Sequence, residues 1–121
     1  MKRVLFVDDE PVVLDTLRRL LRRRRGHWDM VFEAGPEQAL ARLSVETFDV
    51  IVSDLHMPHM SGIELLQRAS ASHPRMVRIV LSGTADLREA EAIADRVLAK
   101  PCDAQHLCSA IDESLVAKEA V

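Results

Sequence analysis

Short apolar runs that alternate with helical patterns are the feature that most constrains the fold of this chain. The first run, 4–7, is apolar on both sides of the predicted strand, as a central parallel strand is, whereas 28–33 alternates between apolar and polar residues. The five predicted strands are 4–7, 28–33, 48–53, 76–81 and 96–99. Strict alternation of strands and helices predicts a doubly wound parallel sheet, because right-handed crossovers place helices on both of its faces.

The segments between the strands carry apolar residues at steps of three and four, which indicates amphipathic helices. The first begins at Pro11, with Asp9 or Glu10 as its predicted N-cap, and Gly26 is predicted to end it. Its predicted apolar stripe is Val13, Leu14, Leu17, Leu20 and Leu21. The other four predicted helices run from Pro36 to Leu43, from Ile63 to Ala69, from Asp86 to Ala94 and onward from an Asp103 cap.

Polar residues follow four of the predicted strands at the point where each strand ends. They are Asp8-Asp9-Glu10, Asp54, Ser82-Gly83-Thr84 and Lys100-Pro101. In an open parallel sheet, ligands bind beyond the carboxyl ends of the strands. The sequence therefore predicts that these groups converge on one crevice. The opposing interpretation is local: Asp8 to Glu10 only cap the first helix, and Asp54 only ends a strand.

Three carboxylates in one crevice predict a divalent cation. Asp8, Asp9 and Asp54 repel one another and lose hydration there, and a hard cation with oxygen ligands removes that cost. We expect Mg²⁺ as the cofactor. Asp54 is the predicted nucleophile, since a carboxylate can attack phosphorus to form an acyl phosphate. Lys100 and Ser82 would then contact the phosphoryl group.

The markers Asp8-Asp9, 54–58 with Gly62, Ser82-Gly83 and Lys100-Pro101 resemble the receiver domain of two-component response regulators over most of the chain. The resemblance implies a flavodoxin-like, five-stranded parallel sheet of order 2-1-3-4-5, a short fourth helix, a receiver domain over 2–117 and a tail over 118–121. It further implies roles at the strand ends: Asp54 as phosphoacceptor, Asp9, Asp54 and the His56 carbonyl as Mg²⁺ ligands, Asp8 acting mainly through water, and Ser82 and Lys100 on the phosphoryl group.

Two departures from that family pattern concern the relay of the signal. Many receivers carry an aromatic residue three positions before the lysine, where this chain has Val97. The stretch from Ser82 to Lys100 is also short for the family. A finer resemblance, at 28–30, 52–54, 78–83 and 100–103, is to receivers attached to HDOD or HD-GYP output domains.

Composition and charge exclude several classes of protein. A net charge of −3 and 3% aromatic residues argue against nucleic-acid binding. The chain lacks an apolar run long enough for a membrane span or a secretory signal, so we expect a cytoplasmic protein. Cys102 and Cys108 are predicted to be free thiols. Six arginines between Arg18 and Arg25 form either a solvated face or a docking patch for an acidic partner.

The leading interpretation is a switch that accepts a phosphoryl group from a histidine kinase or phosphotransfer protein and acts on a fused or separate output domain. A homodimer is a further possibility. The domain would not be a free-standing enzyme, since it modifies only itself. Two other classes compete: a receiver-like interaction module that is never phosphorylated, and a Mg²⁺-dependent phosphatase of the haloacid-dehalogenase kind with an aspartyl nucleophile. His56 and Thr84 are predicted to flank the phosphoryl site.

Overall fold

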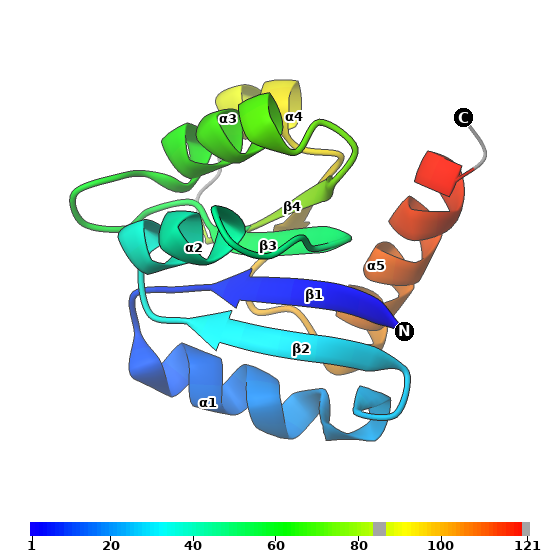
Figure 1. Cartoon of the computed structure of the whole chain (residues 1–121). Coiled ribbons are helices and arrows are strands. Elements are labelled where there is room, and N and C mark those ends of the chain that lie inside the picture. The colour runs from blue at the N-terminus through cyan, green and yellow to red at the C-terminus, as the bar shows by residue number, and fades with distance from the viewer. Residues whose placement is uncertain (84–86, 120–121) are drawn as a thin grey trace.

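A computed structural model of the chain, which describes residues 1–83 and 87–119, contains one five-stranded parallel sheet (Figure 1). The strand order is β2-β1-β3-β4-β5, as predicted. The strands are β1 (Lys2–Val7), β2 (Trp28–Glu33), β3 (Val50–Asp54), β4 (Val77–Ser82) and β5 (Arg96–Ala99). The helices are α1 (Pro11–Leu20), the 3₁₀ turn η1 (Arg22–Arg24), α2 (Pro36–Leu43), α3 (Gly62–Ser72), α4 (Arg88–Ile93) and α5 (Ala104–Glu119).

Two apolar cores sandwich the sheet, because successive strand residues point to opposite faces. Val4 and Phe6 of β1 lie in the core beneath α1 and α5, whereas Leu5 and Val7 lie in the core beneath α2, α3 and α4. All four are at most 2% exposed. Strands buried on both faces explain why the sequence shows continuous apolar runs rather than alternation. Figure 1 shows the same division of the helices between the two faces.

Three local predictions about α1 need correction. The helix ends at Leu20, and the chain continues as η1 well before Gly26. Leu20 is 45% exposed and does not belong to the buried stripe, because the last turn of α1 rotates it away from the sheet. Glu10 occupies the N-cap position, but its side chain makes no capping bond; the Asp8 carboxylate accepts from the Glu10 amide instead, at 2.9 Å.

The carboxyl-terminal half of the chain follows the predictions more closely. The fourth helix is short, with six residues, although its predicted start at Asp86 lies outside the described residues. The Asp103 carboxylate accepts a hydrogen bond from the His106 amide at 2.7 Å, which confirms the predicted cap of α5. Helix α5 continues to Glu119, two residues into the predicted tail. Both cysteines are free and partly buried, as expected. No helix within 1–83 or 87–119 has the length and apolar character required to cross a bilayer.

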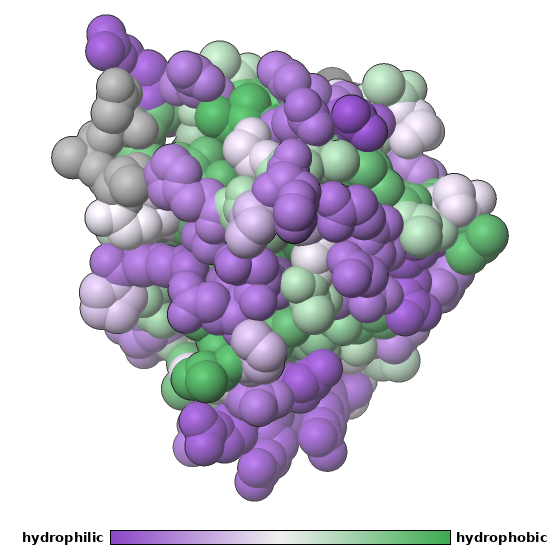
Figure 2. All heavy atoms as spheres, turned by 90° about the vertical axis from the view of Figure 1, so that its left-hand side faces the viewer, coloured by the Kyte–Doolittle hydropathy of each residue, from purple (hydrophilic) through white to green (hydrophobic). Residues whose placement is uncertain are grey.

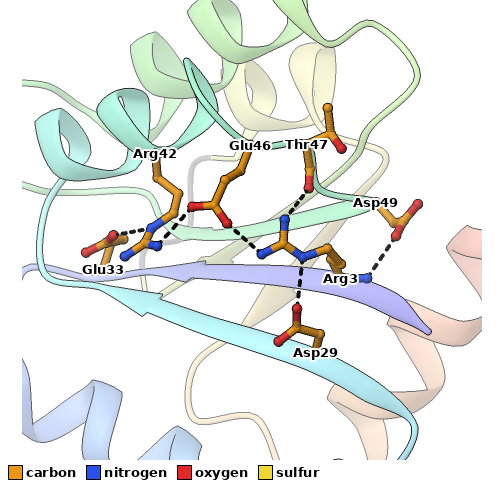
Figure 3. A network of polar contacts seen from close by, with 7 residues as sticks. All are labelled: Arg3, Asp29, Glu33, Arg42, Glu46, Thr47 and Asp49. Atoms are coloured by element: carbon orange, nitrogen blue, oxygen red, sulfur yellow. Dashed lines mark hydrogen bonds and ion pairs between the residues drawn. The ribbon is translucent and has the colours of Figure 1, made fainter.

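An ion-pair network ties β1 and β2 to α2 and to the segment before β3 (Figure 3). The Arg3 guanidinium lies 2.9 Å from Asp29 and 2.8 Å from Glu46. The Arg42 guanidinium lies 2.7 Å from Glu33 and 3.0 Å from the same Glu46. Asp29, Glu33 and Glu46 therefore each contact a guanidinium, and Glu46 contacts two, whereas the Asp49 carboxylate accepts a hydrogen bond from the Arg3 backbone amide at 2.8 Å. The network holds the edge strand β2 in place beside the strand that leads to the functional site.

Candidate functional site

The predicted site residues meet at the carboxyl edge of the sheet, the edge that Figure 2 faces. Asp54 and Ser82 are the last residues of β3 and β4, while Asp8 and Lys100 follow β1 and β5 directly. Parallel pairing in register brings these ends together, since Asp54 pairs with Leu81 beside Ser82, and Ser82 pairs with Ala99 beside Lys100. Hydrophilic residues cover most of this face (Figure 2).

Lys100 joins two of the acids directly. Its ammonium nitrogen Nζ lies 3.1 Å from Oδ1 of Asp54 and 3.4 Å from Oδ2 of Asp8. Asp8 is 2% and Asp54 9% exposed, so both carboxylates are largely withdrawn from water. Buried carboxylates that share one cation still carry surplus negative charge. The three side chains form the centre of the site.

The two oxygens of Asp54 are not equivalent. The backbone amide of Leu55 donates a hydrogen bond to Oδ1 at 2.9 Å, and Lys100 contacts the same oxygen. Within the described parts of the chain, no donor contacts Oδ2. The carboxylate is therefore fixed through one oxygen, which leaves the lone pairs of the other for a cation or for attack on phosphorus.

The acid cluster after β1 provides further oxygen ligands. Oxygen atoms of Asp8, Asp9 and Glu10 lie within 4.8 Å of one another. Asp9 is partly exposed and Glu10 is exposed, and neither forms an ion pair with a described residue. Several oxygens and no nitrogen or sulfur ligand make a donor set that suits Mg²⁺ rather than zinc or copper. The residues present thus fit the predicted cofactor.

Burial and charge perturb the titration of two groups in the site. Burial raises the pKa of Asp8, and the nearby charge of Asp54 adds to that rise, against the opposing effects of the Glu10 amide and Lys100. Burial alone would lower the pKa of Lys100, but its hydrogen bond to Asp54 and the charge of Asp8 outweigh this effect and raise it. Lys100 therefore stays protonated at neutral pH, while Asp8 pays for ionisation unless a cation is near.

Gly62 is required by the way the loop after β3 folds back. Its amide donates to the Leu55 carbonyl at 2.8 Å, and a Cβ atom at this position would overlap the carbonyl oxygen of Asp54. From the sequence, Gly62 was named only as a marker of the family resemblance, so its contact with the Asp54 carbonyl was missed. His59, in the same loop, has φ = 72°, a left-handed conformation that is uncommon outside glycine.

The remaining predicted residues occupy the rim. His56 is exposed two positions beyond Asp54, and its carbonyl as a metal ligand stays a prediction. Thr84 lies outside the described residues. Val97 is partly buried in β5 and packs against the core beneath α2, α3 and α4. The hydrogen-bonding role of Leu55 could not be read from its side chain, because the amide of any residue could supply it.

Comparison with known proteins connects this geometry to a family. Residues 4–112 match the response regulator receiver domain. The rice protein named two-component response regulator ORR22 is 45% identical over 65 residues, which are 54% of this chain. The response regulator receiver protein CpdR of Brucella abortus is 32% identical over 124 residues, covering 97% of this chain and 99% of that protein. The chain spans only 9% of the length of the rice regulator.

Solved structures agree with the fold. A CheY-like response regulator receiver domain protein from Methanospirillum hungatei JF-1 superimposes with a TM-score of 0.89 at 31% identity, covering 99% of this chain and 98% of the other. The signal receiver domain of an HD domain-containing protein from Pseudomonas fluorescens Pf-5 gives 0.88 at 33% identity, covering 98% and 90%. Both similarities extend over nearly the whole chain, so they include all four strand ends of the site.

Proposed function

Because this chain belongs to the response regulator receiver domain family of two-component systems, we propose that Asp54 is its phosphoacceptor. The observation that carries the proposal is the fixing of Asp54 at the end of β3, with Oδ1 held by the Leu55 amide and Lys100. Oxygen Oδ2 would attack the phosphorus of a phosphohistidine. The new O–P bond forms as the P–N bond breaks, and the leaving imidazole retains the electron pair.

Mg²⁺ is the cofactor in this proposal. Asp8, Asp9 and Asp54 would hold it, together with the His56 carbonyl, and Asp8 would act mainly through water. The raised pKa of the buried Asp8 and the surplus of carboxylates over one ammonium support a cation at this edge. When bound, the cation neutralises charge on the phosphoryl oxygens.

Two groups of the chain would position and stabilise the phosphoryl group. The Lys100 ammonium moves from Asp54 toward a phosphoryl oxygen, since Oδ1 becomes the carbonyl oxygen of the acyl phosphate and no longer carries a share of a full charge. The Ser82 hydroxyl, on the neighbouring strand end, donates to a second phosphoryl oxygen. The phosphoryl group adds about −1.5 to −2 charges to the edge, which is the local event that biases the loops after β3 and β4.

The partners in this proposal are a histidine kinase or phosphotransfer protein on one side and an output domain on the other. The Pseudomonas neighbour belongs to an HD domain-containing protein, which supports an output domain of that type here. The reading frame beyond residue 121, or an adjacent gene, is then expected to encode an HD or HDOD domain. An unrelated output domain in both places would refute this part of the proposal.

The test of phosphorylation is direct. The protein is incubated with Mg²⁺ and acetyl phosphate, and its intact mass is measured beside Asp54→Asn and Asp15→Asn, the latter changing an exposed carboxylate of α1. We expect a base-labile adduct of about 80 Da in the wild type and in Asp15→Asn but not in Asp54→Asn. No adduct, and no NMR change with beryllofluoride, would leave an interaction module; steady turnover of a phosphate ester would indicate a phosphatase.

A further inference from the structure

The end of α1 and the turn η1 carry a concentration of positive charge that the phosphoacceptor site does not use. Six of the eight residues from position 18 to position 25 are arginines. Helix α1 starts beside the acid cluster and runs antiparallel to the strands, so its last turn lies at the opposite edge of the sheet (Figure 1). Ten helical residues separate the two ends by about 15 Å.

Two of the six arginines have structural roles. The Arg18 guanidinium stacks over the Phe32 ring at 4.7 Å and pairs with Asp15 at 2.9 Å. The Arg24 guanidinium stacks over the Trp28 ring at 4.1 Å and pairs with Asp112 at 2.9 Å. Both side chains cover aromatic surface, so packing and charge pairing account for them.

The other arginines of positions 18–25 are not explained by ring stacking or by an ion pair with a described residue. Arg19, Arg22 and Arg25, here called the arginine patch, are exposed and surround a shallow hollow of about 380 Å³ with the Arg18–Asp15 pair on its rim. None of the three forms an ion pair with a carboxylate within the described ranges. Arg23 is equally exposed but lies toward α5, at a separate hollow.

Folding alone does not explain the patch. Cations in the last turn of a helix are favoured by the helix dipole, but like charges three or four positions apart repel one another. Arg18 and Arg22, and likewise Arg22 and Arg25, have that spacing. The charge also opposes that of the whole chain, which is −3. A local excess of guanidinium groups in an acidic protein is complementary to an acidic surface elsewhere.

We propose that the arginine patch binds an acidic segment of a protein partner, at a surface separate from the phosphoacceptor site. Guanidinium groups bind carboxylates through two parallel hydrogen bonds, and three of them around one hollow match closely spaced Glu or Asp side chains. Because the patch lies at the far end of α1, the segment stays bound while Asp54 remains open. Occupancy of the patch therefore does not require phosphorylation.

A protein segment fits this surface better than the other polyanions. The nearby rings of Phe32 and Trp28 are covered by Arg18 and Arg24, so they offer no platform on which nucleic-acid bases stack. An anionic membrane requires a broad apolar face beside the charge, whereas Leu20 is the only exposed large apolar residue among described positions 14–28.

The test uses an oligoglutamate peptide as the probe, with the unphosphorylated full chain. The variant Arg19→Gln/Arg22→Gln/Arg25→Gln is compared with Arg68→Gln/Arg75→Gln/Arg96→Gln, which removes the same charge elsewhere. We expect peptide-induced NMR shifts at residues 19–25, binding that weakens as salt is raised, and an affinity about tenfold lower for the patch variant only. Relief of repulsion should leave the patch variant at least as stable as the wild type.

Three results would overturn the proposal: equal peptide affinity in the two triple variants, NMR shifts outside the patch, or tighter binding of a DNA duplex or of anionic vesicles than of the peptide. Acetyl phosphate labelling of the patch variant separates this proposal from the function of Asp54. That labelling is expected to equal the wild-type level, and its failure in the wild type would leave the peptide result intact.

Discussion

The molecule holds two clusters of charge on one sheet, and they are built on opposite principles. In the ion-pair network of Figure 3, Asp29, Glu33 and Glu46 each contact a guanidinium, Asp49 accepts from the Arg3 backbone amide, and most of the side chains are partly exposed. At the carboxyl edge, Asp8 and Asp54 are buried and share one ammonium, while Asp9 and Glu10 have no ion-pair partner among the described residues.

The difference separates charge that stabilises from charge that is held ready. A paired surface network contributes a modest amount to stability, and its charges need no ligand to neutralise them. A buried surplus of carboxylates costs stability in the absence of a ligand, which supports the proposed binding of a cation and a phosphoryl group at this edge. Changes at the carboxyl edge should therefore alter function, and equivalent changes in the network should alter stability alone.

The largest expected effect is steric and acts on the carboxyl edge. Gly62→Ala places a Cβ atom against the Asp54 carbonyl oxygen, and backbone on both sides has to shift. We expect a loss of roughly 2–3 kcal/mol in the free energy of unfolding, measured with urea, and reduced phosphorylation. Gly26→Ala is the control, because its Cβ would meet nothing within 4 Å. Equal stability of the two variants would show that the loop can move away freely.

The labelling rate of Lys100→Ala, compared with that of the network variant Arg42→Ala, tests the difference between the two clusters most directly. Without the ammonium, Asp8 and Asp54 repel each other and the incoming phosphoryl group loses a positive charge. We expect labelling by acetyl phosphate to slow by about 10- to 100-fold. Arg42→Ala removes one cation from the network and should leave the labelling rate at the wild-type value. If both variants slowed equally, the distinction between the two clusters would fail.

Arg3→Met examines the network itself. The substitution keeps an apolar stem but removes the bonds to Asp29, Glu46 and the Thr47 carbonyl, along with the stacking over Phe48 at 4.3 Å. We expect a loss of about 1–2 kcal/mol in thermal or urea unfolding, smaller in high salt, with labelling of Asp54 unchanged. A change in labelling larger than the change in stability would connect the network to the site.

Asp8→Asn is expected to give the smallest effect, and its sign is informative. Burial raises the folded-state pKa of Asp8 above the unfolded value, so its contribution to stability is full below the unfolded pKa and is lost as pH rises through the folded pKa. Without Mg²⁺, the free energy of unfolding of the variant should therefore exceed that of the wild type at pH 7, and the difference should vanish at acidic pH, as urea unfolding at the two pH values would measure.

The metal dependence of Asp8→Asn supplies the matching control. Added Mg²⁺ should stabilise the wild type by mass action and the variant much less. A variant that is less stable than the wild type in chelator would mean that the carboxylate stabilises the empty site, contrary to the comparison between the two clusters.

Much of the fold could be predicted because its signals are local. Strands β2 and β5 and helix α2 have the predicted bounds, since alternation marks β2, an apolar run marks β5 and a proline marks the start of α2, all without help from distant residues. The ends of α1 could not be predicted in the same way. Leu20 fits the helical period, yet the chain turns into η1, and which leucine faces the sheet depends on how the helix packs.

The candidate site shows the same division. Asp8, Asp54, Ser82 and Lys100 were identifiable because each follows a predicted strand, and parallel pairing brings strand ends together whatever the side chains are. The close approach of Gly62 to the Asp54 carbonyl was not identifiable, because it depends on the path of a loop. The ion-pair network was also missed, since Arg3 and Glu46 are far apart in sequence.

The sequence by itself determined the alternating pattern, the order of the strand-end residues and hence the family and the chemistry available to it. Those properties reside in periodicity and residue type, which are local. Only the tertiary structure decided which Asp54 oxygen is held, which acids are buried against Lys100 and which arginines of positions 18–25 form no ion pair with a described residue. Those properties depend on distances between segments remote in the chain, and packing of the whole sheet sets them.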